Sequence, residues 1–579
     1  MILAAWVGLA SGSLGAIFQL VPRAVAEDWP LWRMESLQNL WIPVLTDLTV
    51  FLLLGLVLMA AGFVVRGRHH LMWSTGIFVA LGSYGLISSA ANLQERGAVV
   101  LATGLGSVAA RWMNRDPAVR FKLVRRSLAP LAVAVLALCL LPWPAEWLRE
   151  RFLLATLPQA PQDAPNILVV VIDTLRADRL GVYGNQSRLT PFLDEWAQRS
   201  AVFEHAFANS SWTLPSHVSL FTGTLPHEHG AEVHRYDRRF PTLAGRLAEQ
   251  GYATVALVAN ASFAGYESGV LAGFQWAATP RPWSVYLRSS IYVQKFAKYV
   301  SKAPFKNDFE HIWQDAAGIN QEFLQWIHSR PPRPFFAFLN FMDVHEPYNA
   351  FTTELSPPAD RAAEPLACPA DAAQVRDASQ RYDAAISLLD RQLRHLFETL
   401  RQLDLDRNLL VVITSDHGQA FGEHGLLGHR ESLYLEQLHV PLLIRFPGQK
   451  DGWRSSVPVG LQQIPASVAD WVGLEGEPFP GRPLPASSEV TDPDAAVLSD
   501  LTGGPWPGVA TCSPIYQGGI RSLLTAEWHL LEQNDGKVEL FAWPRDPTEE
   551  HNLAARPEYQ NVMASLLERL GQLRSEGGH

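Results

Sequence analysis

Cysteine is scarce in this chain, with only 3 among 579 residues. Cys139 lies in an apolar run, where a thiol ordinarily behaves as a small hydrophobic side chain. Only Cys368 and Cys512 are left to form a disulfide, and the sequence does not supply the distance between them. A network of disulfides is therefore excluded, and at most a single bridge can form.

The chain also lacks an excess of basic residues. Its 47 Lys and Arg residues against 57 Asp and Glu residues give a net charge of -10. A nucleic-acid-binding domain ordinarily has a basic balance or a strongly basic face, so we expect no nucleic acid among the partners. The sequence contains no internal repeat or low-complexity tract either, and its length suits one large domain or several ordinary ones.

Carboxylates are few in the first 145 residues, where Leu, Ala, Val and Gly dominate. A helix that crosses a bilayer needs about 20 mostly apolar residues. Five windows approach this requirement, although the last two are short: 2–21, 42–65, 71–91, 98–110 and 128–141. We expect residues 1–145 to form a transmembrane region with about five helices.

The positions of the basic residues predict how this region is oriented, because Lys and Arg collect in cytoplasmic loops. The loop between the last two windows holds six of them: Arg111, Arg115, Arg120, Lys122, Arg125 and Arg126. With five spans, everything after Leu141 is then outside the cytoplasm. Residues 146–165 are predicted to be a Pro-rich linker. We therefore expect an integral membrane protein with an extracytoplasmic catalytic domain.

Two apolar segments after the linker are each followed by residues whose side chains can bind a metal ion. Residues 166–172 read as a buried strand followed by Asp173, and residues 408–414 read as another, followed by Ser415, Asp416 and His417. Ligands of open α/β sheets bind beyond the carboxyl ends of the strands. Asp and His suit Mn, Mg, Ca or Zn. The alternatives are a turn capped by Asp173 and a salt-bridged turn after the second strand.

The segment from Trp212 to Gly223 resembles the start of a helix. It has Thr213 at the expected N-cap, Pro215 in the first turn and Gly223 just past the end. A hydroxyl there can serve as a nucleophile, because the helix N-terminus and a nearby cation both favour its alkoxide. Capping of the helix is the ordinary alternative for such a threonine.

Five blocks of sequence carry a family resemblance. They read PNILVVVIDTLRADRLGVYG, SWTLPSHVSLFTGTLPHEHG, FLNFMDVHEPY, SDHGQAFGEHGLLGHRESLYLEQLHVPLLI and ELFAWPRDPTEEHNLA. Together they resemble the sulfatase family of the alkaline-phosphatase superfamily, in the family's order, from about Pro165 to Leu553. The resemblance implies an α/β catalytic domain over residues 166–499 with helices on both faces of a central sheet. A small C-terminal α+β subdomain would follow over residues 500–579.

The resemblance also implies a metal centre. Asp173, Asp416 and His417 would bind one divalent ion, namely Ca, Mg or Mn, with Zn as a further candidate. Thr213 would contact both this metal and the substrate, as the nucleophile. These roles are carried over from the family's motifs position by position.

Further residues would act on the substrate. The resemblance implies that His345 and His429 contact the oxygens of the transferred group or protonate the leaving group, for which the near-neutral pKa of histidine is suited. Arg176 and His217 would be substrate-binding residues. For Arg176, an ion pair with Asp178 is an equal alternative.

The nucleophile motif departs from the family pattern. Sulfatases of this family usually have Cys or Ser, then Pro and Arg, and convert the first residue to formylglycine. Here the residues are Thr213, Leu214, Pro215, Ser216 and His217, so no formylglycine is expected. The pattern is closer to the Thr nucleophiles of lipoteichoic-acid synthases and phosphoethanolamine transferases.

The sequence therefore predicts a hydrolase or transferase that acts on sulfate or phosphate esters. The tether to the membrane favours a lipid or an envelope glycan as its substrate. The alternative is a catalytically inactive membrane sensor or scaffold that keeps the sulfatase fold.

Overall fold

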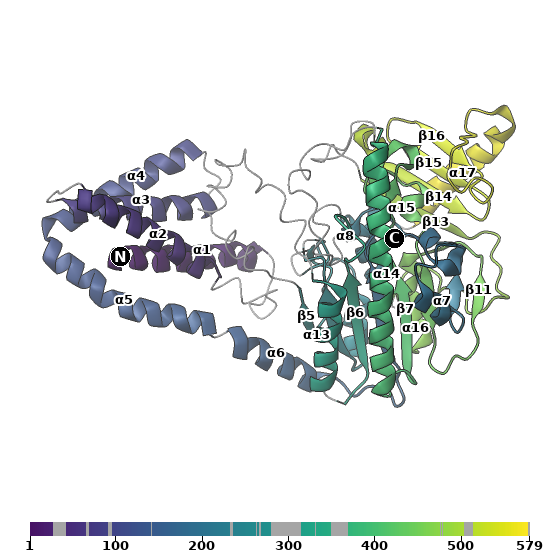
Figure 1. Ribbon diagram of the computed structural model, residues 1–579, viewed down its shortest axis with the longest axis horizontal. Helices are drawn as coiled ribbons and strands as arrows, with labels where there is room; N and C mark the ends of the chain where they lie inside the picture. The colour runs from purple at the N-terminus through teal and green to yellow at the C-terminus, as the bar shows by residue number, and fades with distance from the viewer. Residues whose placement is uncertain are drawn as a thin grey trace. The chain divides into compact units, whose positions relative to one another are not determined.

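The computed structural model of the chain contains two compact units, one from Met1 to Leu153 and one that combines Leu154–Pro280 with Phe309–His579. Figure 1 shows the helices and strands of both units. The structure describes residues 1–26, 42–64, 69–90, 95–140, 142–231, 236–261, 263–265, 268–279, 314–330, 332–348, 369–474, 476, 479–502 and 513–576. Cys368 and Cys512 lie outside these residues, so their pairing stays a prediction.

The first unit is helical. Its elements are α1 (Ile2–Ala26), α2 (Ile42–Val64), α3 (His70–Ala90), α4 (Glu95–Arg115), α5 (Pro117–Leu140) and α6 (Pro142–Thr156), the last of which continues into the second unit. Helix α1 packs on α2, and α3 packs on α4. The α3–α4 contact depends on glycine, since a Cβ on Gly106 would lie 2.5 Å from the carbonyl oxygen of Gly76.

The five predicted membrane windows overlap α1 to α5, one window with each helix. Among the described residues, one segment, His70–Ile87, is long and apolar enough to cross a membrane, while Ile2–Gly15 and Val44–Ala60 are shorter apolar helical segments. The loop predicted between the last two windows is wrong, because α4 ends at Arg115 and α5 begins at Pro117. All six basic residues therefore lie on these two helices, which shortens the apolar parts of α4 and α5. The five-span membrane region stays a prediction.

The predicted Pro-rich linker is partly helical. Helix α6 covers Pro142–Thr156, so only the second half of residues 146–165 is non-helical. Proline is tolerated in the first turn of a helix because its missing N–H has no partner there in any case. Pro142 and Pro144 occupy that first turn.

The second unit contains an eight-stranded sheet. Its order is β11-β2-β10-β7-β1-β6-β4-β5. The strands are β1 (Asn166–Ile172), β2 (Ala201–Phe203), β4 (Ala253–Val258), β5 (Trp276–Ala278), β6 (Phe335–Phe341), β7 (Leu409–Thr414), β10 (Leu442–Arg445) and β11 (Trp453–Ser455). Strands β7, β1, β6 and β4 run parallel, and β10 is antiparallel to β7. The central strands are continuous apolar runs because the sheet is buried on both faces.

Helices cover both faces of this sheet, as predicted. Alternate residues of β1 point to opposite faces: Val169 and Val171 join one hydrophobic core, and Val170 and Ile172 join the other. The first core contains residues of α8 (Thr213–Thr222), α10 (Leu243–Glu249) and α16 (Ile464–Trp471). The second contains residues of α7 (Pro191–Ala197), α13 (Ala316–Ser329) and α14 (Ala372–Gln402), and Figure 1 shows α14 running along the strands.

The C-terminal segment, predicted to be a small α+β subdomain, contains a four-stranded antiparallel sheet and one helix. It consists of β13 (Ala496–Leu501), β14 (Ile520–Thr525), β15 (His529–Gln533), β16 (Val538–Phe541) and α17 (Gln560–Glu576). The predicted boundary after residue 499 falls inside β13, which pairs along its whole length with β14. The remaining strands and α-helices of this unit are short: β3 (Ala206–Phe207), β8 (Ala420–Phe421), β9 (Leu427–Gly428), β12 (Val459–Gly460), α9 (Pro226–His229) and α15 (Leu435–Leu438).

Candidate active site

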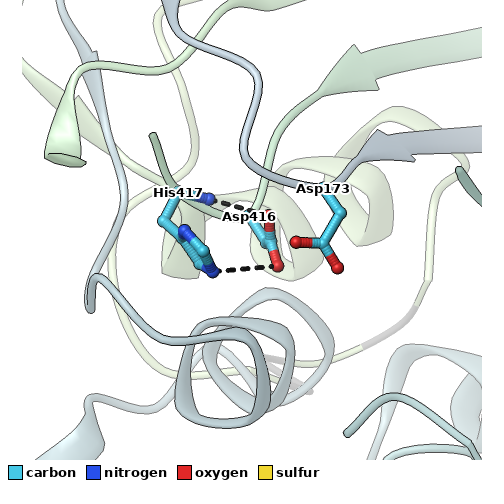
Figure 2. A group of neighbouring side chains, drawn as sticks. All are labelled: Asp173, Asp416 and His417. Atoms are coloured by element: carbon cyan, nitrogen blue, oxygen red, sulfur yellow. Dashed lines mark hydrogen bonds and ion pairs between the residues drawn. The ribbon is translucent and has the colours of Figure 1, made fainter. Parts of the chain in front are cut away.

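The carboxyl ends of two adjacent parallel strands bring the predicted metal ligands together. Asp173 follows β1 directly, and Asp416 and His417 follow β7 after one serine. One ligand atom from each of these three side chains lies within 4.8 Å of the other two. All three residues are fully buried. Figure 2 shows their side chains facing one another.

The hydrogen bonds of the two carboxylates leave one oxygen free on each. Asp173 Oδ2 accepts from Asn260 Nδ2 at 3.0 Å. Asp416 Oδ1 accepts from the backbone N–H groups of Thr174 at 3.2 Å and His417 at 2.9 Å. Asp173 Oδ1 and Asp416 Oδ2 are buried and have no hydrogen-bond partner in the described part of the chain. Unpaired buried oxygens of this kind are costly unless a cation is bound.

His417 offers a third ligand atom. Its Nδ1 lies 3.0 Å from the carbonyl oxygen of Gly418, and we assign the ring proton to Nδ1 because a carbonyl can only accept. Nε2 then carries the lone pair, 3.5 Å from Asp416 Oδ2. Burial lowers the pKa of His417 to about 4, which favours the neutral ring that metals bind. Two carboxylates and one imidazole fit a divalent metal ion such as Mg, Ca, Mn or Zn.

Burial also raises the pKa of both carboxyl groups. For Asp173 the nearby charge of Asp416 adds to this effect. For Asp416, burial is partly offset by His217 and by the backbone N–H of Thr174. A divalent cation between the carboxylates would reverse the shift, since an adjacent positive charge favours the ionised form.

Thr213 lies beside this cluster and does not cap its helix. Helix α8 begins at Thr213, and the N-cap is Trp212, whose extended backbone (φ -137°, ψ 136°) precedes the helix. The predicted N-cap position is therefore wrong by one residue. The Thr213 Oγ1 atom lies 3.4 Å from His417 Nε2, and Thr213 itself is buried. The hydroxyl is thus placed for chemistry at the candidate metal site.

The two predicted catalytic histidines lie next to His417. His345 follows β6 and His429 follows β9. The ring centroid of His429 lies 4.8 Å from that of His417 and 4.9 Å from that of His345. Burial lowers the pKa of His429 well below its usual value. Burial would do the same to His345, but the charges of Asp173 and Glu346 raise its pKa above the usual value.

Arg176 is engaged by carboxylates of the protein. Its guanidinium donates to Asp178 at 2.9 and 2.7 Å, to Glu423 at 2.8 Å and to the carbonyl oxygen of Gln419 at 2.9 Å. The ion pair with Asp178, which the sequence left as an equal alternative, is therefore the observed arrangement. The substrate contact of Arg176 stays a prediction, because these acceptors use four of the five guanidinium N–H groups.

His217 lies on α8, one turn after Thr213, and is fully buried. Its Nδ1 is 2.8 Å from the Thr213 carbonyl oxygen and 3.6 Å from Asp416 Oδ2. Its Nε2 has no hydrogen-bond partner in the described part of the chain. The structure thus places His217 against a predicted metal ligand, and its contact with a substrate stays a prediction.

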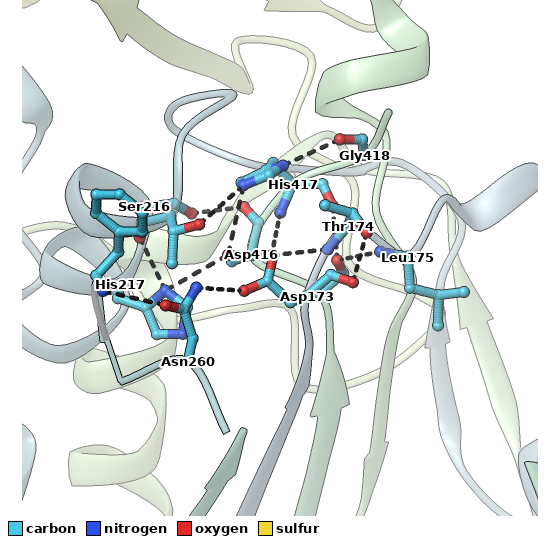
Figure 3. Close-up of polar contacts among 12 residues, drawn as sticks. Asp173, Thr174, Leu175, Ser216, His217, Asn260, Asp416, His417 and Gly418 are labelled. Atoms are coloured by element: carbon cyan, nitrogen blue, oxygen red, sulfur yellow. Dashed lines mark hydrogen bonds and ion pairs between the residues drawn. The ribbon is translucent and has the colours of Figure 1, made fainter. Parts of the chain in front are cut away.

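Asn260 was not predicted from the sequence. It follows β4, the fourth of the adjacent parallel strands, and only 3% of its surface is exposed. Figure 3 shows its side chain directed at Asp173. Its position shortly after the apolar residues 253–258 is the same signal that identified Asp173 and Asp416. Ser216 was missed as well, and its hydroxyl ties α8 to the carbonyl oxygen of Asp416 at 2.6 Å.

Comparisons with known proteins agree with this geometry. The family model described as Sulfatase matches residues 165–474. The "Ulvan-active sulfatase" of Formosa agariphila is 23% identical over 72% of this chain and 82% of that protein. The "Choline-sulfatase" of Rhizobium meliloti is 26% identical over 69% and 85%, respectively.

Solved structures share the fold. The phosphonate monoester hydrolase of Agrobacterium radiobacter superposes with a TM-score of 0.55 and 22% identity, over 71% of this chain and 96% of that one. The family match covers more than half of the 579 residues, and it includes the eight-stranded sheet, α8 and the histidines of the site. The chain therefore belongs to the sulfatase family and is an ester hydrolase.

Proposed function

We propose that the chain hydrolyses sulfate or phosphate esters with the Thr213 hydroxyl as nucleophile and a divalent metal ion held by Asp173, Asp416 and His417. One observation carries the proposal. The Thr213 hydroxyl is not used to cap α8, and it lies 3.4 Å from His417 Nε2 beside two carboxylate oxygens that have no partner in the described structure.

The metal and Thr213 would share the first chemical step. A divalent cation supplies positive charge that favours the alkoxide of a hydroxyl and offsets the charge of a bound sulfate or phosphate group. Thr213 Oγ1 attacks sulfur or phosphorus, so that a new O–S or O–P bond forms and the bond to the alcohol oxygen breaks. The hydroxyl of Thr213 gives up one proton and the departing oxygen gains one, which balances the step.

The covalent Thr213 ester is then cleaved. Water attacks the sulfur or phosphorus atom, the bond to Thr213 Oγ1 breaks, and the hydroxyl is regenerated. With an acceptor alcohol in place of water, the same ester would give a transferase. His345 and His429 lie in contact with each other beside His417, and we assign them to proton transfer at the leaving oxygen and at the attacking water.

The substrate and its location belong to the same proposal. The sulfatases among the relatives favour a sulfate ester, while the phosphonate monoester hydrolase shows that this fold also accommodates phosphorus chemistry. The apolar helices of the N-terminal unit support a membrane anchor. The basic residues between the last two predicted windows favour a catalytic domain outside the cytoplasm. An anchored domain would reach a lipid headgroup or an envelope glycan.

The test is an assay of the detergent-solubilised full chain. Aryl sulfate, aryl phosphate and an aryl phosphodiester are each offered with Mg²⁺, Ca²⁺, Mn²⁺ or Zn²⁺. Thr213→Ala should reduce turnover of the preferred ester at least about 1,000-fold, because loss of a nucleophile removes the covalent route. Thr213→Ser keeps a hydroxyl and serves as the matched control with measurable turnover.

Two results would contradict the proposal. Turnover in Thr213→Ala equal to the wild type would eliminate Thr213 as nucleophile. A wild-type chain that binds metal but turns over none of the three esters would instead favour the inactive sensor or scaffold.

A further inference from the structure

A second group of metal-binding residue types lies apart from the catalytic centre. It consists of His424, Glu436 and Glu549, which each offer one ligand atom within 4.8 Å of the others. His424 lies in the short turn between β8 and β9, and Glu436 lies in α15. Glu549 comes from the C-terminal subdomain, between β16 and α17. The group therefore connects the catalytic domain with the C-terminal subdomain.

Glu436 is the unusual member of this group. Only 8% of its surface is exposed, and its Oε1 atom is buried without a hydrogen-bond partner in the described chain. The nearby Arg176 has other carboxylate partners, because it pairs with Asp178 and Glu423. Burial raises the pKa of Glu436 well above its usual value, and the adjacent Glu549 adds to the effect. An unpaired carboxylate beside a second one calls for a cation.

Glu549 is held in place as metal-binding carboxylates commonly are. It is 2% exposed, its Oε2 accepts from the backbone N–H of Leu435 at 2.9 Å, and its Oε1 pairs with Nδ1 of His529. The other ring nitrogen of His529 lies 2.7 Å from Ser522 Oγ. Partners of this kind orient a ligand and adjust its basicity. Each oxygen of Glu549 keeps a second lone pair, so these bonds leave it able to bind a cation.

His424 offers an imidazole nitrogen as a ligand atom and lies at the protein surface. Its ring stacks on that of Tyr434, with centroids 3.7 Å apart and planes 11° from parallel, which fixes the ring orientation. The Tyr434 hydroxyl is anchored in turn by Glu539 at 2.8 Å. Burial of the ring lowers the pKa of His424, although Glu549 opposes the shift, so the neutral ring is favoured. The residue as a whole is exposed, which gives an ion a path to the buried carboxylates.

We infer that His424, Glu436 and Glu549 bind a second divalent cation, which ties the C-terminal subdomain to the catalytic domain. One imidazole nitrogen and two carboxylate oxygens are a ligand set that suits Zn²⁺, with water completing the coordination. We assign this site a structural role, because its ligands come from both the catalytic domain and the C-terminal subdomain. The inference does not depend on the proposed function of Thr213.

The test counts Zn²⁺ bound by the full chain in detergent. Asp416→Asn serves as the background, because it weakens the catalytic metal site and leaves the second site to be measured. After treatment with a chelator and dialysis against Zn²⁺, this variant should retain one equivalent by elemental analysis. Adding Glu436→Gln, which keeps the shape and removes the charge, should abolish it. The absence of Zn²⁺ from the Asp416→Asn chain overturns the inference, as does its retention after Glu436→Gln.

A matched control and a second measurement guard against misfolding. Glu532→Gln alters a partly buried carboxylate of β15 that already pairs with Arg521 at 3.0 Å, and it should keep the Zn²⁺. Equal loss in both glutamine variants contradicts the assignment. In the Asp416→Asn background, saturating Zn²⁺ should also raise the melting temperature. Substitution of the exposed His424 in His424→Ala should remove that increase, and an unchanged increase refutes the role of His424.

Discussion

Replacement of Asn260 by alanine removes a hydrogen bond that orients a predicted metal ligand. Asn260 Nδ2 donates to Asp173 Oδ2 at 3.0 Å, and both residues are buried. A hydrogen bond to a charged group contributes about 1.5–3 kcal/mol, and each 1.4 kcal/mol corresponds to about a tenfold change in an equilibrium constant. We therefore expect Asn260→Ala to weaken metal binding about 10- to 100-fold, the range found for residues that support metal ligands.

The assay is the dependence of ester turnover on metal concentration. The concentration for half-maximal activity should rise by this factor, while kcat at saturating metal should stay within about threefold of the wild type, because Thr213 and the histidines are unchanged. The Asn260 side chain makes two hydrogen bonds, and Asn260→Asp removes one of them. It keeps an acceptor for the backbone N–H of Phe263, now 3.1 Å from Asn260 Oδ1, but loses the donor to Asp173.

Asn320→Ala is the matched control for buried asparagine. It lies in α13, is 2% exposed and donates to the Gln392 carbonyl oxygen at 3.0 Å, away from the site. Its half-saturating metal concentration should not change. The reasoning is refuted when Asn260→Ala reaches half-maximal activity at the same metal concentration as the wild type. It is also refuted when kcat at saturating metal falls but the half-saturating metal concentration stays the same.

Two further predictions concern stability, and thermal melting of the solubilised chain measures both. Gly106→Ala should lower the melting temperature, because the new Cβ would lie 2.5 Å from the Gly76 carbonyl oxygen and overpacking costs about 1–3 kcal/mol. Gly104→Ala is the control and should leave the melting temperature unchanged, because a Cβ there meets nothing within 4 Å. Equal effects of the two substitutions would disprove the α3–α4 contact. Burial lowers the pKa of His229 from 6.5 to about 3. Between pH 6.5 and pH 3 the unfolded chain binds a proton on this histidine that the folded chain excludes. The contribution of His229 to the free energy of unfolding is therefore complete above pH 6.5 and is lost as the pH falls towards 3, by up to about 1.4 kcal/mol per pH unit. The loss in melting temperature between pH 7 and pH 5 should be smaller in His229→Asn, and an equal loss contradicts the assignment.

The sequence predicts those parts of the site that follow from local pattern. Asp173 and Asp416 were found because each follows a long apolar run, and the helix after Thr213 was found from its proline and glycine. Asn260 obeys the same rule, but asparagine after a strand is also an ordinary turn residue. The pairing of Arg176 with Glu423 joins residues 247 positions apart, and no local pattern reports such a contact. The helix α6 was missed because prolines indicate a linker unless they fall in the first turn of a helix.

The register of the sheet explains why ligands from distant segments meet. Val171 of β1 pairs with Thr414 of β7. The next residues along these two strands, Ile172 and Ser415, therefore lie side by side, and each is followed directly by a ligand, Asp173 or Asp416. Neighbouring strands are about 4.8 Å apart. This spacing brings the side chains that follow the two strands close enough to share one ion.

The same register places Asn260. Val258 of β4 pairs with Asn340 of β6, and Ile172 of β1 pairs with Phe341, so Asn260 and Asp173 flank the end of β6 on either side. The two side chains reach each other across that end, where their hydrogen bond forms. A shift of one residue in any of these pairings would turn a ligand to the opposite face of the sheet. The buried apolar strands therefore determine the metal site as much as the ligands do, because burial on both faces is what fixes the register.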